Sequence, residues 1–109
     1  DDRPPREALQ LRFGATEIAG RIAASLHEAL GIDLDNLEAA MASGDADKVG
    51  DTLHRMAGGT GAVGTLVIAH HLRDLSTAVV RDGLTGQRTA LEKVQQVMTV
   101  YRNVVGSLL

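Results

Sequence analysis

The distribution of proline and of apolar residues constrains this fold more than any other feature of the sequence. Both prolines, Pro4 and Pro5, lie in the first six residues, and the rest of the chain has none. Because proline breaks helices, its absence permits long uninterrupted helices from there on. Apolar side chains then recur every three or four residues in four successive stretches, which places them on one face of a helix. The pattern predicts an all-α chain.

The first helical stretch extends from about Thr16 to Ser43. On a helical projection, six apolar residues share an arc of about 120°, the width of a core-facing stripe; they are Ile22, Leu26, Leu30, Leu34, Leu37 and Met41. Gly31 interrupts the stretch at a cost of about 1 kcal/mol, but the stripe keeps its phase across it. We therefore expect one long helix. A break at Gly31, with a new start at Asp33 or Asp35, is the alternative.

Three further helices follow. The second begins after the turn Ser43-Gly44-Asp45, with Asp45 or Asp47 as the N-cap. The third begins near Thr65 and stops at Asp82-Gly83, and the fourth extends from about Gln87 to the C-terminus. Their expected inward residues are Val49, Leu53, Met56, Thr60 and Val63, then Ile68, Leu72, Leu75 and Val79, then Leu91, Val94, Met98, Tyr101, Val105 and Leu108. Four amphipathic helices with short loops predict an antiparallel up-and-down four-helix bundle.

The length of 109 residues suits one domain and not two. We expect residues 1–13 to form a linker or short N-terminal extension and residues 14–109 to form the bundle. Because the chain begins with Asp1 rather than Met, we interpret it as a piece of a longer protein. The apolar content of 44 % provides a sizeable core, which must be aliphatic because Phe13 and Tyr101 are the only aromatic residues.

Charge and cysteine content exclude several functions. The chain has no cysteine, which rules out disulfides and thiolate chemistry. Eleven basic residues against 14 acidic ones argue against a nucleic-acid-binding protein, which usually shows a basic excess. No apolar run approaches the roughly 20 residues of a membrane span, and no signal peptide is recognisable. We therefore expect no direct contact with nucleic acid or membrane.

The stretch most informative about function is LHRMAGGTGAVG, residues 53–64. Because Leu53 and Met56 face the core, His54 points to the side of its helix, toward solvent. Its neighbours on that face are Gly50, Asp51, Ala57, Gly58 and Gly61. Each glycine inside a helix costs about 1 kcal/mol relative to alanine, and close approach by another surface is a physical reason to keep three of them. A neutral imidazole on such a surface can attack phosphorus and form a phosphoramidate.

These residues resemble the histidine-containing phosphotransfer (HPt) domain, found at the C-terminal end of bacterial hybrid sensor histidine kinases. That family shows a histidine followed by an apolar residue at +2, glycine at +4, and a run of small residues ending in an apolar-glycine pair. The matching residues here are His54, Met56, Gly58, Gly61, Ala62, Val63 and Gly64, and Ser43-Gly44-Asp45 is similar to the family's turn before the histidine helix. The resemblance covers roughly residues 16–109.

The resemblance implies a phosphorelay through His54. The phosphoaspartate of a receiver domain in the same kinase would donate its phosphoryl group to His54, which would pass it to the aspartate of a separate response regulator. The docking surface would comprise Gly50, Asp51, Arg55, Ala57, Gly58 and Gly61. The domain itself would be a monomeric phosphocarrier, not an enzyme, with no metal or cofactor of its own; Mg²⁺ would be held by the receiver. The parent would be an inner-membrane sensor kinase with this domain in the cytoplasm.

Two positions depart from the family pattern. Ala57 occupies the position that is often lysine, so the usual positive charge beside the histidine is missing. Arg55 or Lys48 is expected to substitute for it. Ser76 stands where many relatives have an acidic residue. Both departures concern the electrostatics of docking and leave the nucleophile in place.

Other motifs favour other interpretations less well. Gly59–Gly64 reads GxGxxG, but helical residues precede it, and the 18 residues to Asp82 cannot hold both a helix and a strand, so a dinucleotide site is not expected. His70 and His71 point about 100° apart on a helix and cannot chelate one metal; we expect one exposed and one half-buried. A kinase dimerisation helix would have an acidic residue after the histidine and a proline nearby, and His54 has neither. The main alternative is a helical interaction module without phosphotransfer; the heptad spacing of the last helix also allows a coiled-coil dimer.

Overall fold

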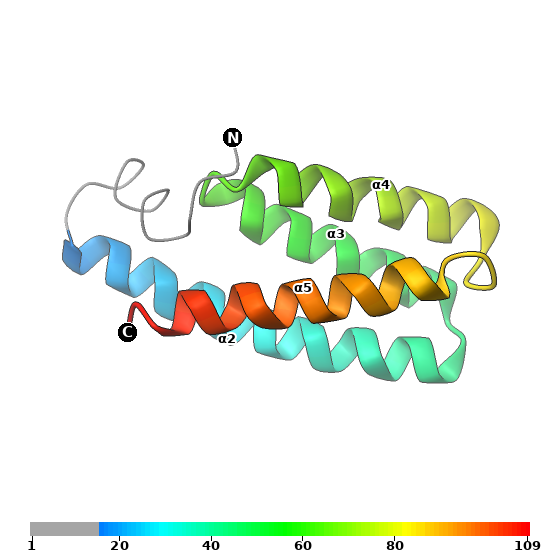
Figure 1. The fold of residues 1–109 in the computed structure, drawn as a ribbon, viewed down its shortest axis with the longest axis horizontal. Coiled ribbons are helices and arrows are strands. Elements are labelled where there is room, and N and C mark those ends of the chain that lie inside the picture. Colours follow the sequence, from blue (N-terminus) through cyan, green and yellow to red (C-terminus); the bar gives the residue numbers. More distant parts are fainter. Residues whose placement is uncertain (1–15) are drawn as a thin grey trace.

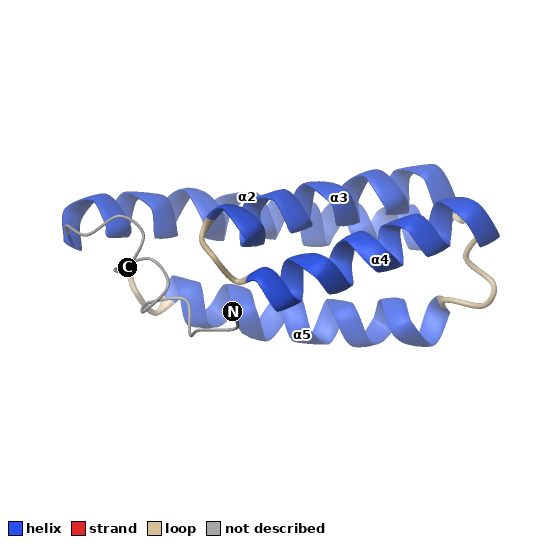
Figure 2. Cartoon of the chain, turned by 90° about the horizontal axis from the view of Figure 1, so that it is seen from above, coloured by secondary structure: helices blue, strands red, loops and turns tan. Residues whose placement is uncertain are grey.

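The computed structural model describes residues 16–109, and the regular structure in this range is helical throughout. The elements in chain order are α2 (Thr16–Ser43), α3 (Ala46–Ala62), α4 (Leu66–Asp82) and α5 (Arg88–Gly106). They lie lengthwise side by side in Figure 1, and Figure 2 shows the short loops that join them. The expected four-helix bundle is confirmed. The extension expected at residues 1–13 lies outside the described residues.

Helix α2 continues through Gly31, which confirms one long helix of 28 residues. The reason for glycine at this position lies on α5. A Cβ at residue 31 would lie 2.6 Å from Nη2 of Arg102, whose Nε donates a hydrogen bond of 2.9 Å to the backbone carbonyl of His27. Gly31 therefore leaves space for a side chain that joins α5 to α2.

The turn between α2 and α3 determines where the histidine helix begins. Gly44 has a φ of 72°, in the left-handed region that favours glycine after a helix end. Asp45 is the N-cap of α3, and its side chain accepts a hydrogen bond of 3.1 Å from the backbone N–H of Lys48. Of the two expected caps, Asp45 is therefore the one used.

The expected stripes form the core. Leu53, Met56 and Leu91 have no exposed surface, and of the expected inward residues only Ile22, Leu34, Ile68, Val94 and Leu108 are partly exposed. Within residues 16–109, no helix combines the length and apolar content that a membrane span requires.

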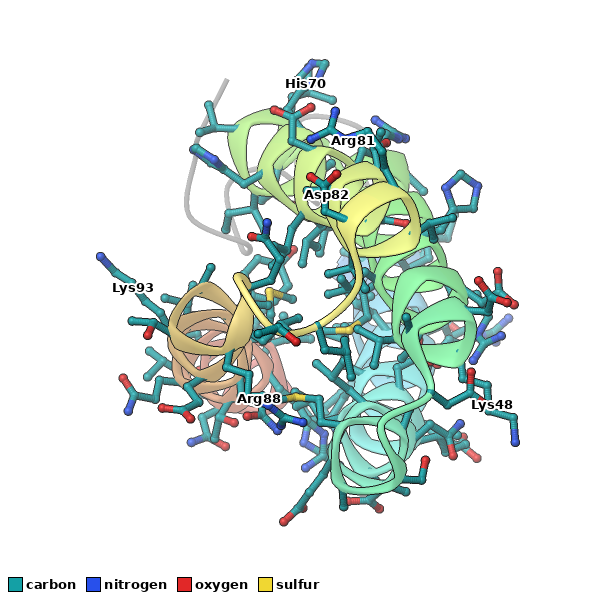
Figure 3. The ribbon with its side chains drawn as sticks, turned by 90° about the vertical axis from the view of Figure 1, so that its right-hand side faces the viewer. Lys48, His70, Arg81, Asp82, Arg88 and Lys93 are labelled. Carbon is teal, nitrogen blue, oxygen red and sulfur yellow. The ribbon has the colours of Figure 1, made fainter. Side chains whose placement is uncertain are left out.

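The helices pack in the spatial order α4, α3, α2, α5. Helix α3 packs on α4 and on α2, and α5 packs on α2, whereas α4 and α5 barely touch. The view along the bundle in Figure 3 shows the space between α4 and α5. One side of α3 is thus bordered by α4 and the other by α2, and the strip between them faces solvent.

Candidate functional site: the exposed face of α3 around His54

His54 lies in the middle of α3 with its side chain exposed. Leu53 and Met56, on either side of it in sequence, are fully buried and hold this part of the helix in the core. Because successive residues on a helix point about 100° apart, a buried Leu53 places the imidazole on the flank of the helix, beside the core-facing side. The expectation that His54 faces solvent is confirmed.

The surface next to His54 is bare along the helix. Gly58, one turn after His54, is exposed, and a Cβ placed there would meet no other atom within 4 Å. Gly61, two turns after His54, is half-buried, and Asp51, one turn before it, is exposed. We call these four residues (Asp51, His54, Gly58 and Gly61) the His54 face. It offers a partner an imidazole with open space on its C-terminal side.

Two expected docking residues lie elsewhere. Gly50 and Ala57 are buried where α3 packs on α4. A Cβ on Gly50 would collide with Cγ2 of Val80, and the hydroxyl of Ser76 donates a hydrogen bond of 2.7 Å to the Gly50 carbonyl. The expectation that Gly50 and Ala57 line an exposed surface is wrong, because the surface that approaches them is α4 of the same chain.

Arg55 also departs from its expected place. Its Nε lies 3.4 Å from Oδ1 of Asp33 on α2, and its Nη2 donates a hydrogen bond of 3.4 Å to the hydroxyl of Thr52. Since Asp33 is only 9 % exposed, the guanidinium neutralises an otherwise buried carboxylate between the two helices. Arg55 is therefore engaged with α2 and does not supply a free cation beside the imidazole.

Lys48, the other expected substitute for the missing lysine, lies on the same side as Arg55. Both line a hollow of about 600 Å³ between α2 and α3. In Figure 3, Lys48 projects outward on the side of the bundle away from α4. His54 lies on the other flank of α3, because it is four residues after Gly50 and three before Ala57, both of which face α4. Residue 55 points about 100° away from it, toward α2.

The residues that the sequence reasoning missed are on α4. The guanidinium of Arg73 rests over Gly61, with Nη2 3.5 Å from the position a Cβ would take there. Val80, which is 54 % exposed, contacts Gly50 from the other end of the same seam. A signal for these positions exists in the sequence: residues equally distant from a short helix–helix turn lie opposite each other. Gly50 and Val80 each lie 15 residues from Thr65 in that turn, and Ala57 and Arg73 each lie eight residues from it.

The two adjacent histidines and the two groups with a shifted pKa lie on α4. His70 and His71 are both exposed, so the expectation that one is half-buried is wrong. No group of three or more metal-binding side chains occurs in the part of the chain that the structure describes. At the C-terminal end of α4, a hydrogen bond from Arg81 lowers the pKa of the Asp82 carboxyl and raises that of the guanidinium. Figure 3 shows this exposed pair beside each other.

A second concave feature lies between α4 and α5. It is a groove of about 570 Å³, lined mainly by apolar side chains that include Ile68, Leu75 and Val97. Three polar side chains, His71, Asp74 and Lys93, also line it. The spacing of apolar residues did not predict this groove. That spacing shows which side of α4 and α5 faces the core, but not that the two helices stay apart and leave the groove between them.

Comparisons with known proteins give no assignment. No family model, curated protein or solved structure matches the chain. The interpretation of the site therefore depends on its residues and their geometry.

Proposed function

We propose that this chain is an up-and-down four-helix phosphotransfer domain in which His54 carries a phosphoryl group between receiver domains. The observation that carries the proposal is the exposed imidazole on a helix fixed by the buried Leu53 and Met56, with open space over Gly58. A group-transfer nucleophile needs access for its partner and a fixed backbone beneath it, and His54 has both.

The chemistry requires only the imidazole from this chain. The ring nitrogen that carries no proton attacks the phosphorus of an aspartyl phosphate. An N–P bond forms as the bond between phosphorus and the carboxylate oxygen breaks, and the carboxylate leaves with the bonding electrons. The other ring nitrogen keeps its proton during the transfer. The reverse sequence on a second aspartate regenerates His54.

The partners follow from this chemistry. The donor would be a receiver domain of the same parent kinase and the acceptor a separate response regulator, with Mg²⁺ bound by the receiver in each case. This chain would act as a monomeric phosphocarrier in the cytoplasm, attached to an inner-membrane sensor kinase. The docking surface would comprise the His54 face together with the part of α4 that borders it.

A helical interaction module without phosphotransfer is the second candidate. The apolar groove between α4 and α5 favours it, because concave apolar surfaces are common protein-binding sites. In that case His54 would be an ordinary surface histidine.

Transfer from a labelled receiver tests the proposal. Receiver domains would be phosphorylated with radioactive acetyl phosphate and Mg²⁺, freed of the donor and incubated with the chain. We expect label to move to wild type and to the His70→Gln variant, whose exposed histidine lies on α4. We expect none on His54→Gln, because the nucleophile is lost. If receivers discharge without labelling wild type, or if His54→Gln is labelled like wild type, the proposal is wrong.

A further inference from the structure

Because residue 57 is alanine and not lysine, another group must neutralise a phosphoryl group on His54. A phosphoryl group carries close to two negative charges, and a nearby cation stabilises it. Ala57 is fully buried, so its position does not face the imidazole from the solvent side. Arg55 is held by Asp33, and Lys48 lies on the α2 side. The cation must therefore come from outside α3 if this chain supplies it.

Arg73 on α4 meets the geometric requirement. Gly50 lies against Ser76 and Val80, and Gly61 lies against Ala69 and Arg73, so α3 and α4 pass each other in opposite directions. This register places the backbone of Arg73 near the level of residue 57, roughly 5 Å along the helix axis from His54 at about 1.5 Å per residue. In the structure the guanidinium itself lies against Gly61, seven residues and about 10 Å further along α3 than His54, so Arg73 has to turn back along the helix to reach the imidazole.

The surface next to His54 on the side of Arg73 is open at Gly58. The guanidinium rests over Gly61, and the next exposed residue toward His54 is Gly58, where no atom lies within 4 Å of a Cβ position. A side chain at either position would fill the strip that the guanidinium has to cross. The path from the guanidinium of Arg73 to the imidazole of His54 therefore passes over these two glycines.

Arg73 is also available. It is exposed and has no ion pair or side-chain hydrogen bond with any residue in the range 16–109. By contrast, Arg21, Arg55 and Arg81 are each paired with a carboxylate. An unpaired guanidinium loses no existing ion pair when it turns toward a phosphoryl group.

We propose that Arg73 reaches across Gly61 and Gly58 and binds the phosphoryl group on His54, supplying from α4 the positive charge that Ala57 lacks. This inference rests on the proposed function of His54 and adds a phosphate-binding residue from a different helix.

The test uses phosphoramidate as the donor, which transfers its phosphoryl group to an imidazole and releases ammonia, so no receiver is needed. We expect Arg73→Gln to be phosphorylated about tenfold more slowly than wild type, in line with loss of one charge-assisted hydrogen bond. Arg73→Lys keeps the charge and should retain most of the rate. Arg88→Gln is the matched control, because Arg88 is exposed on α5, whose backbone does not pack on α3. Circular dichroism checks that each variant is folded.

A second readout observes the contact directly. In proton–nitrogen correlation spectra, the Nε–H signal of Arg73, identified by its absence from Arg73→Lys, should shift when His54 is phosphorylated, whereas that of Arg88 should not. Normal labelling of wild type with an unchanged rate for Arg73→Gln and an unmoved Arg73 signal would overturn this inference alone. If phosphoramidate and the labelled receivers both leave His54 unmodified, the proposed function falls and this inference falls with it.

Discussion

At the residue scale, glycines of α3 that look alike in the sequence have different surroundings. Gly50 and Gly58 lie one turn before and one turn after His54. Gly50 is buried against Val80 and Ser76 on α4, whereas Gly58 faces open space. The first is required for packing of the two helices, and the second leaves the histidine accessible.

The same substitution at both glycines separates these roles. Gly50→Gln should lower the free energy of unfolding by about 2 kcal/mol, because overpacking forces α3 and α4 apart. Gly58→Gln should keep or raise it by about 0.5 kcal/mol, since glutamine is the better helix former. Urea unfolding measures both.

Phosphotransfer assays on the same two variants test whether the space over Gly58 is used in docking. Gly58→Gln, although folded, should accept phosphate from a receiver more slowly, because its side chain occupies the space beside His54. A transfer rate equal to that of wild type would show that clearance over Gly58 is not used in docking.

At the scale of elements, the turn between α3 and α4 is fixed by a buried polar contact with α5. The Thr65 hydroxyl donates to the Thr60 carbonyl at 2.7 Å and lies 2.9 Å from the Tyr101 hydroxyl. The turn itself contains Gly64, with a φ of 90°. Since α4 and α5 have few backbone contacts, this pair of hydroxyls adds a polar connection between α5 and the turn that joins α3 to α4.

Removing the Tyr101 hydroxyl should therefore loosen the turn between α3 and α4. Tyr101→Phe keeps the buried ring and should lower the free energy of unfolding by about 1 kcal/mol, the usual value of one hydrogen bond. Thr65→Ser, which retains a hydroxyl, should cost less than Thr65→Ala. Amide hydrogen exchange should show faster exchange in residues 62–68 of Tyr101→Phe than in wild type. Unchanged stability and exchange would mean that the hydroxyl pair contributes nothing to the turn.

Elements were also the part of the structure that the sequence predicted best. Helix starts and stops depend on local chemistry, such as the Asp45 cap and the glycine at 83, and the inward stripes depend on spacing alone. The site was predicted less well, because the wrong predictions concern contacts between two helices. That Gly50 is buried and that Arg55 turns to Asp33 depend on which helix borders each flank of α3. Spacing within one helix carries no information on that order.

At the scale of the whole molecule, the order α4, α3, α2, α5 leaves one side of the bundle open. Along α5 this side continues as three exposed valines, Val97, Val100 and Val104, which are 45 %, 62 % and 41 % exposed. They lie at spacings of three and four residues and so share one face of the helix. The heptad spacing expected to form core is thus accompanied by a second, solvent-facing apolar stripe.

We expect this stripe to leave the chain monomeric. A stable dimer buries about 1,200 Å² or more in total, and three partly exposed valines provide far less. Sedimentation equilibrium should give a mass of 11.5 kDa across a wide range of protein concentration. The midpoint of thermal unfolding should also be independent of concentration, because only an associating protein gains stability by mass action. Val100→Glu is the control and should leave both measurements unchanged. A larger mass that returns to that of one chain in Val100→Glu would instead identify the exposed face of α5 as an interface between two copies.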